Sequence, residues 1–342
     1  MRDSKRVRIG LFLLWLAALV IFVAEAARGN SPGELALGVL YFAAVLAALL
    51  ALGLPEVVSG LRLWIAGSWI RGLALPAVAW VLAFVYALLV GQLGGMLALL
   101  VYLLVPVLLV LAARRVGEKP NLWDLVAILA IWLPVEVGWI GKPDLPAGHG
   151  VMGLGHILAI VMAIYAYVVV RELKGVGYRF DLTWKDVGWA LAYFFMFMPI
   201  ALAVGLSTGF LHIARHMPSV FELVATPIAI FLFTGIPEET LFRGLIQNSL
   251  SQRIREKSRW HPWALVLASI IFGWAHVNNH VPPLVDWYLG PLGTISVPWV
   301  YVVLATVAGV FYGLAYLRTG KLTAAAIVHA LVDAVWGMFL SG

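Results

Sequence analysis

The chain has 342 residues, of which 63% are hydrophobic and only 12% are charged, and its mean hydropathy is +0.98. A soluble domain carries about 25% charged residues, so a water-soluble enzyme is excluded. At about 20 apolar residues per membrane-spanning helix, this composition supplies about ten or eleven spans. The chain has no cysteine, which excludes disulfides, thiolate zinc sites and cysteine nucleophiles.

Apolar runs interrupted by proline, glycine and charge predict an all-α, polytopic transmembrane helix bundle of about eleven spans, with a range of nine to eleven. The junction around Gly91, Gly94 and Gly95 is ambiguous, because residues 73–113 could form either a helical hairpin or one broken helix. We expect the first span to remain as an anchor instead of being cleaved as a signal peptide. The predicted spans are 9–27, 35–54, 73–91, 93–113, 122–140, 151–170, 187–210, 221–250, 262–281, 297–317 and 322–341.

The lysine and arginine residues test this segmentation, because cytoplasmic loops carry an excess of them. With a cytoplasmic N-terminus, Arg28, Lys142 and Arg215 fall outside and Arg243 falls within a span, whereas the other nineteen of the 23 basic residues fall inside. This bias predicts a cytoplasmic N-terminus and an external C-terminus. It also accounts for the net charge of +6 without nucleic acid as a partner. The lipid bilayer is the expected environment, and the expected location is the cell membrane.

The longest polar stretch, residues 171–186, separates six predicted spans from five. We therefore predict an N-terminal transmembrane region at 1–180, without an assigned role, and a catalytic core at 181–342. Ionisable residues inside spans are costly and mark function, and they are concentrated in the second region. The few in the first region, such as Asp124 and Glu136, are expected to be paired or to lie at the interface.

Three short segments carry the ionisable residues of the second region. Each lies within a predicted span, about 10–22 Å from the cytoplasmic end of its helix at 1.5 Å per residue. The residues are therefore expected to meet in one cavity that opens toward the cytoplasm. The segments are EETLFR (238–243) with Glu238, Glu239 and Arg243, FGWAH (272–276) with His276, and HALVD (329–333) with His329 and Asp333.

Spacing predicts how these side chains pair. Glu239 and Arg243 are four residues apart on one helix face, so we expect the guanidinium to neutralise that carboxylate through a planar two-point contact. Glu238 points elsewhere, with His276 as its expected partner. The segment Thr234–Glu239 is expected to form a cap, a turn and a new helix start at Pro237, whose N-terminus favours ionised carboxylates.

Two carboxylates and two histidines in a dry cavity predict hydrolysis, because a carboxylate and a histidine can hold and deprotonate water while a further donor receives the oxyanion. The three segments resemble the EExxxR, FxxxH and HxxxN/D motifs of the CPBP family, which includes type II CAAX prenyl endopeptidases and bacteriocin-processing or self-immunity membrane proteins. The resemblance covers about residues 181–342. It implies an intramembrane endopeptidase.

The resemblance also implies a role for each site residue. Glu238 and His276 would activate water, and His329 with Asp333 would form the oxyanion site. Glu239 and Arg243 would support the other four. Asp333 departs from the amide of similar prenyl proteases, and an ionised carboxylate cannot donate to an oxyanion. Asp333 would have to be protonated, or else orient His329 by accepting a hydrogen bond from it.

Several alternatives remain open from the sequence. The substrate is expected to be a membrane-anchored protein or peptide, cleaved at a CAAX-like site or a C-terminal sorting tail. A non-catalytic immunity or scaffold protein of the same family is the alternative function, and an ion-coupled transporter is a third. No cofactor is expected, although Glu238, Glu239, His276 and His329 could jointly bind zinc.

Overall fold

The computed structural model describes residues 2–27, 30–146, 152–214, 217–254, 262–288, 290 and 293–341. The chain divides into two compact units, Met1–Asp181 and Leu182–Gly342. Five basic residues that contributed to the charge count lie outside the described residues, namely Arg28, Arg215, Arg255, Lys257 and Arg259.

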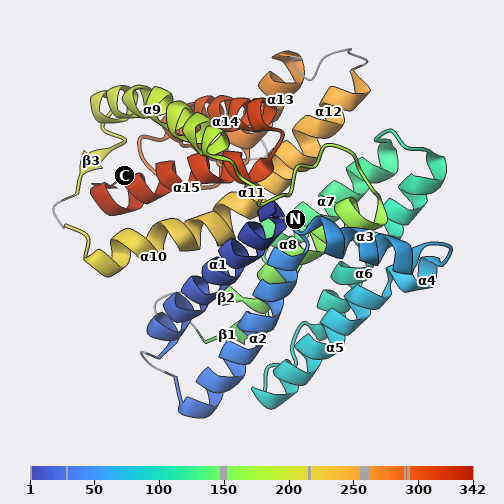
Figure 1. The fold of residues 1–342 in the computed structure, drawn as a ribbon. Helices are drawn as coiled ribbons and strands as arrows, with labels where there is room; N and C mark the ends of the chain where they lie inside the picture. The colour runs from blue at the N-terminus through green and yellow to red at the C-terminus, as the bar shows by residue number, and fades with distance from the viewer. Residues whose placement is uncertain are drawn as a thin grey trace. The chain divides into compact units, whose positions relative to one another are not determined.

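The first unit is helical, blue to green in Figure 1, with one pair of two-residue strands. Gly91 and Gly95 both adopt positive φ between two helices, so the ambiguous stretch 73–113 is a helical hairpin. Asp124 forms a buried ion pair with Arg171, with Nε and Oδ1 2.8 Å apart, as expected for an ionisable residue in this region. The elements are α1 (Arg2–Ala26), α2 (Pro32–Ala51), α3 (Pro55–Ile65), α4 (Trp69–Gly72), α5 (Ala74–Leu89), α6 (Met96–Val116), α7 (Leu122–Glu136), β1 (Asp144–Leu145), β2 (Met152–Gly153), α8 (Leu154–Ile164) and the π-helix η1 (Tyr165–Val170).

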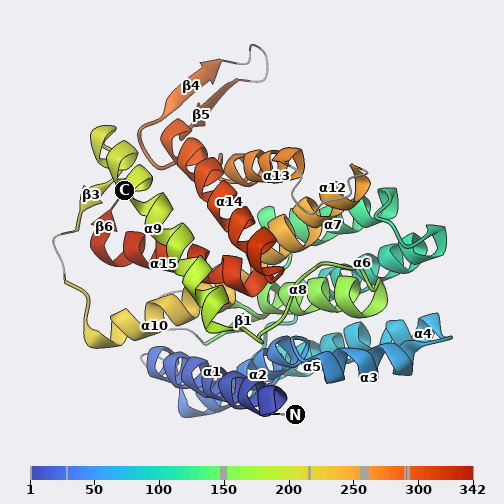
Figure 2. The same cartoon turned by 45° about the horizontal axis from the view of Figure 1, so that its top comes forward.

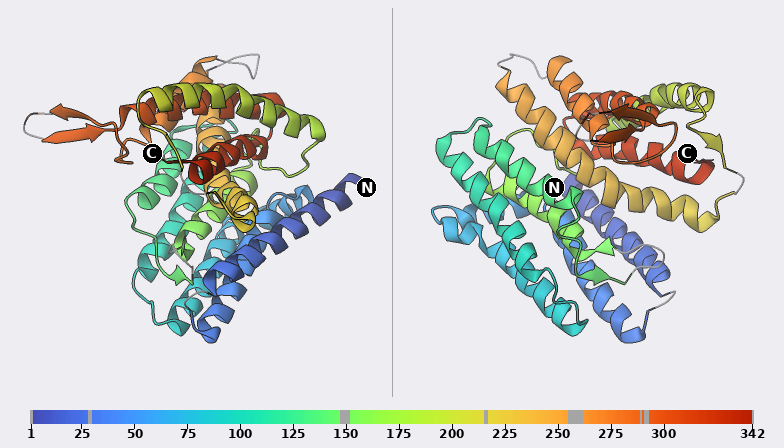
Figure 3. Two further views of the ribbon diagram at one scale, coloured as in Figure 1. Left: turned by 90° about the vertical axis from the view of Figure 1, so that its left-hand side faces the viewer. Right: turned by 180° about the vertical axis from the view of Figure 1, so that it is seen from behind.

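The second unit is a bundle in which α14 packs against α9, α13 and α15, and Figure 2 shows α14 running between α9 and α13. An antiparallel hairpin of β4 and β5 projects beyond these helices in Figure 3. The elements are α9 (Trp184–Ser207), β3 (His212–Ile213), α10 (Val220–Ile230), η2 (Phe231–Gly235), α11 (Ile236–Glu239), η3 (Thr240–Gln247), α12 (Asn248–Arg253), α13 (Pro262–Trp274), β4 (Val285–Tyr288), β5 (Thr294–Val297), α14 (Trp299–Thr319), α15 (Leu322–Phe339) and β6 (Leu340–Ser341).

The two ends of this bundle differ in charge. Lys321 donates to Asp186 at 2.8 Å, and Arg318 lies 4.3 Å from the ring of Trp189. These contacts join the end of α14 and the start of α15 to the start of α9. At the opposite end, β3 pairs with β6 and so joins the segment after α9 to the end of α15. The first end carries the basic residues, and we refer to it as the base-rich end.

The predicted all-α polytopic bundle is confirmed, although its span count is not. Among the described residues, eight helices are long and apolar enough to cross a membrane. The other three predicted spans are shorter: α7 has 15 residues, α8 with η1 covers Leu154–Val170, and α13 has 13. A helix of 13 residues reaches about 20 Å of a hydrocarbon core about 30 Å thick. Eleven spans, and the orientation derived from them, remain predictions.

Candidate active site

The two adjacent glutamates lie on an unbroken helical stretch, Val220–Arg253. Gly235 has helical φ and ψ of −61° and −54°, without a side-chain cap, so the predicted turn and new helix start are wrong. Pro237 lacks a donor and its ring crowds the preceding turn. The chain absorbs this by widening into η2 before Pro237 and η3 after Glu239. No helix N-terminus therefore faces the carboxylates in this described stretch.

Close helix packing brings the glutamates to α15. A Cβ atom on Gly235 would lie 2.9 Å from the backbone oxygen of Ala326, so only glycine allows this approach. The approach places Glu239 Oε1 2.9 Å from His329 Nδ1.

Arg243, Glu239 and His329 form a buried chain of charges, in which Glu239 lies between the other two. Arg243 Nε lies 3.1 Å from Glu239 Oε2, and both side chains are fully buried, so the predicted pairing is confirmed. The predicted two-point contact is wrong, because Arg243 Nη2 donates instead to the Gly309 carbonyl of α14 at 2.9 Å. The guanidinium also lies over Phe272, with Cζ 4.6 Å from the ring centre. Arg243 therefore ties η3 to α13 and α14 as well as neutralising Glu239.

His329 stands between three carboxylates. Besides the contact to Glu239, its Nε2 lies 3.2 Å from Asp333 Oδ2 and 3.8 Å from Glu238 Oε2. A ring nitrogen that faces a carboxylate must carry the proton of the hydrogen bond, so this geometry suits an imidazolium protonated on both nitrogens. The structure thus places Glu238 beside His329, and the expected pairing of Glu238 with His276 stays a prediction.

His276 follows the last turn of α13 and is joined to it. Its Nδ1 lies 2.8 Å from the Phe272 carbonyl oxygen, which can only accept. Nδ1 therefore carries a proton, and in the neutral ring Nε2 holds the lone pair. The ring of Phe272 lies 4.7 Å from that of His276 and 5.8 Å from that of His329, so it forms an apolar wall beside both histidines.

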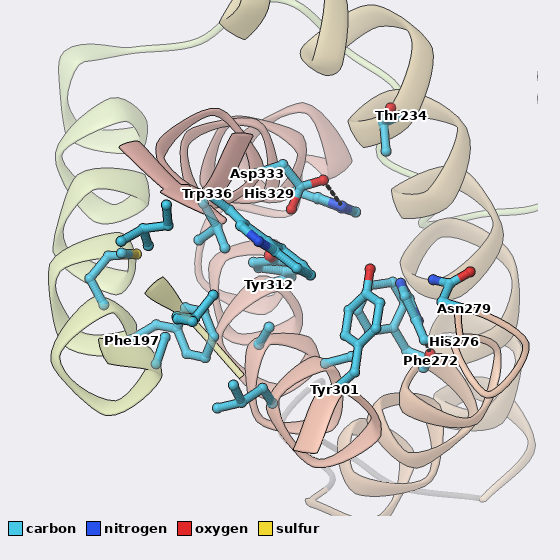
Figure 4. Close-up of a pocket in the computed structure, with 18 of the residues that line it drawn as sticks. Phe197, Thr234, Phe272, His276, Asn279, Tyr301, Tyr312, His329, Asp333 and Trp336 are labelled. Atoms are coloured by element: carbon cyan, nitrogen blue, oxygen red, sulfur yellow. Dashed lines mark hydrogen bonds and ion pairs between the residues drawn. The ribbon is translucent and has the colours of Figure 1, made fainter. Parts of the chain in front are cut away.

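Four of the six predicted site residues line one cavity of about 180 Å³, which is shown in Figure 4. Glu238, His276, His329 and Asp333 contribute the polar wall, while Glu239 and Arg243 lie buried behind it. The facing wall is apolar. It comes mainly from α9 and α14 and includes Phe197, Met198, Ala201, Leu304, Ala305 and Ala308.

The cavity extends toward the end of the bundle opposite the base-rich end. Its lining includes Leu211 after α9, Asn279 after α13 and Leu340 after α15. Arg243 and Gln247, which lie nearer the base-rich end, are fully buried and are not part of its lining. The charge bias predicts that the base-rich end is cytoplasmic, so the expected opening toward the cytoplasm does not fit this lining.

Helix α14 lines the cavity although none of its residues belongs to the three sequence motifs. Tyr312 stacks on His329, with ring centres 4.7 Å apart, and the ring of Tyr301 lies 5.1 Å from that of His276. The signal was present as a stripe with helical periodicity, because the cavity residues of this helix are Tyr301, Leu304, Ala305, Ala308 and Tyr312.

Taken together, the apolar helices and the buried acid–base residues define a multi-pass membrane protein with a cavity lined by ionisable side chains. Residues 220–335 match the family model described as type II CAAX prenyl endopeptidase Rce1-like. The resemblance of this segment to the CPBP family, which includes CAAX-type intramembrane endopeptidases, is confirmed by this match. A search of curated proteins gave no match, and a search of solved structures gave none either.

Membrane orientation can be tested by labelling, because the chain has no cysteine. Single cysteines at exposed Tyr288 and Arg253 lie beyond opposite ends of the bundle. With an impermeant maleimide added outside intact cells, we expect labelling at 288, and at 253 only after permeabilisation. Labelling of position 253 in intact cells would reverse the orientation.

Reporter fusions provide a second test of the orientation. A reporter fused at residue 117 or 256 should report a cytoplasmic location, and one fused at 145 or 288 should report export.

Proposed function

We propose that the second unit hydrolyses a peptide bond in a membrane-anchored protein or peptide, using a water molecule activated by Glu238 and His276. The observation that carries this proposal is their shared cavity: the Glu238 carboxylate and the His276 imidazole line it together with an apolar facing wall. A substrate segment on the apolar wall would lie with its backbone toward both groups. The multi-pass bundle restricts such a substrate to proteins that reach the bilayer.

The chemistry follows from which groups can accept a proton. Glu238, or Nε2 of His276, takes a proton from water as the oxygen attacks the carbonyl carbon. The carbonyl oxygen then carries the negative charge of the tetrahedral intermediate. The same proton passes to the amide nitrogen, the C–N bond breaks, and an acid and an amine are released.

Three buried side chains would support these groups without contacting the substrate. Arg243 neutralises Glu239, and Glu239 accepts a hydrogen bond from His329. This arrangement fixes the orientation of His329 beside Glu238. Fixed charges of this kind need no reorganisation during the reaction.

The donor set of the site does not suit zinc. A zinc ligand must offer a lone pair, but both nitrogens of His329 face carboxylates, and Glu239 is held by Arg243 and His329. Within the described part of the chain, no group of three or more His, Cys, Asp or Glu side chains could hold a metal ion. We therefore propose a reaction in which no step passes through a metal.

Metal dependence is tested directly on purified protein. We expect cleavage of a fluorogenic peptide to be unchanged by a strong chelator, and the protein to hold far less than one equivalent of zinc. Stoichiometric zinc, with activity lost on chelation and restored by zinc, would contradict the proposal while leaving the same residues at the site.

The cavity also favours a side of access. Because its lining runs to the end opposite the base-rich end, we propose that substrates enter from the non-cytoplasmic side. A C-terminal sorting tail that emerges there fits this access better than a prenylated cytoplasmic C-terminus. Comparative proteomics of a knockout strain, searched for one uncut membrane-proximal tail, tests this substrate class.

A further inference from the structure

Hydrolysis needs a hydrogen-bond donor for the oxyanion of the tetrahedral intermediate. In segment 329–333, both candidate donors, His329 and Asp333, are engaged with each other. Asp333 Oδ2 faces His329 Nε2 at 3.2 Å, and an ionised carboxylate has no proton to donate. Both nitrogens of His329 face carboxylates. The N–H groups of His329 are thus directed at carboxylates, and an oxyanion needs a donor that is not already engaged in this way.

Tyr301 lies in the right place. It is in the first turn of α14 and lines the same cavity as Glu238 and His276. Its ring lies 5.1 Å from that of His276. Figure 4 shows the Tyr301 hydroxyl facing the cavity beside His276 and Asn279.

The surroundings hold Tyr301 in one orientation. Its ring packs edge-on against Trp336 at 5.0 Å and lies 5.6 Å from Phe210. The side chain of Asn279 makes a polar contact with Tyr301. A donor fixed before the reaction stabilises a developing charge more than one that must reorganise.

We propose that the Tyr301 hydroxyl donates a hydrogen bond to the oxyanion, with Asn279 as its positioning residue. This inference rests on the proposed peptidase function. A phenol is a neutral donor, so it can stabilise negative charge beside Glu238 without forming a competing ion pair. In this chain Tyr301 supplies the donor that an amide at position 333 would otherwise provide.

The test compares substitutions that remove only the hydrogen-bonding groups. Tyr301→Phe keeps the ring that packs on His276, Trp336 and Phe210. With a fluorogenic, lipid-anchored peptide selected by cleavage with the wild-type protein, we expect kcat to fall by about 10²–10³-fold, the usual effect of losing one oxyanion donor, with little change in KM. A phosphonate analogue of that peptide, which mimics the tetrahedral intermediate, should lose affinity by a similar factor.

Two further variants separate a chemical role from a structural one. Tyr316→Phe removes a hydroxyl from the same helix at a residue that does not line the cavity, and it should cleave normally. Asn279→Ala should lower kcat in the wild-type background and have no further effect in the Tyr301→Phe background, because it acts through the lost hydroxyl.

The outcomes distinguish the two proposals. If the wild-type protein shows no cleavage that depends on Glu238, the peptidase function fails. If the wild-type protein cleaves but Tyr301→Phe retains full kcat and full phosphonate affinity, the peptidase function stands and the role of Tyr301 is overturned.

Discussion

Glu238→Gln is expected to abolish peptide-bond hydrolysis in a protein that still folds. An amide cannot take a proton from water, and a general base contributes about 10²–10⁴-fold to the rate. The substitution conserves shape at a position that is partly exposed to the cavity. It leaves the buried contacts of Glu239 with Arg243 and His329 in place. The measurement is kcat on a reporter peptide in proteoliposomes, with thermal unfolding of the same sample.

A matched control exists on the same helical stretch. Glu222 is exposed in the first turn of α10, where it forms a capping box with Ser219. Glu222→Gln should therefore cleave normally and change stability only slightly. Glu238→Gln with a wild-type kcat would remove Glu238 from water activation. A wild-type protein that binds peptide without cleaving it would favour the immunity or scaffold alternative.

The sequence predicted the composition of the site because its residues are tied to helical spacing. Glu239 and Arg243 lie one turn apart, as do His329 and Asp333, so each pair is a neighbour on one helix before any tertiary packing. Membrane helices also restrict where charge can lie, since a charged residue facing lipid is costly. Together these two constraints predicted the Glu239–Arg243 ion pair and a common cavity.

Contacts between helices could not be predicted in the same way. How closely His329 approaches the two glutamates depends on how closely Gly235 lets its helix approach α15, and spacing within one helix does not determine that approach. The two π-helical segments around Pro237 are likewise a response to packing, so the predicted helix start failed there. Tyr301 belongs to no motif, because its place in the site comes from the face that α14 presents to the cavity.

The end at which the cavity opens could not be predicted either. The spacing argument measured depth along each helix from the base-rich end and assumed that access lay on that side. In the structure the cavity lining runs instead to the other end of the bundle, at Leu211, Asn279 and Leu340. Depth along single helices does not determine the end at which the space between them widens, because that depends on how the helices pack.

Arg243→Ala is expected to lower stability and abolish cleavage together. Removing the guanidinium leaves the buried Glu239 carboxylate with His329 as its remaining charged neighbour, and breaking a buried ion pair in this way costs about 3–5 kcal/mol. The Gly309 carbonyl loses its donor as well. The thermal midpoint should fall by on the order of 10 °C, measured on purified protein in one detergent.

Arg243→Lys should rescue little of this loss. The guanidinium contacts Glu239 through Nε, donates to Gly309 through Nη2, and lies flat over Phe272, whereas an ammonium is a point charge that cannot make all three contacts. Arg253→Ala is the matched control, since Arg253 is exposed at the end of the same helical stretch. Its stability should change by less than about 0.5 kcal/mol.

A second substitution separates the two effects of Arg243. In the Arg243→Ala background, Glu239→Gln removes the orphaned negative charge, so much of the lost stability should return. Cleavage should not return, because His329 then lacks the ionised partner that orients it beside Glu238. If Arg243→Ala alone kept both the wild-type thermal midpoint and wild-type cleavage, the buried chain of charges would support neither the fold nor the reaction.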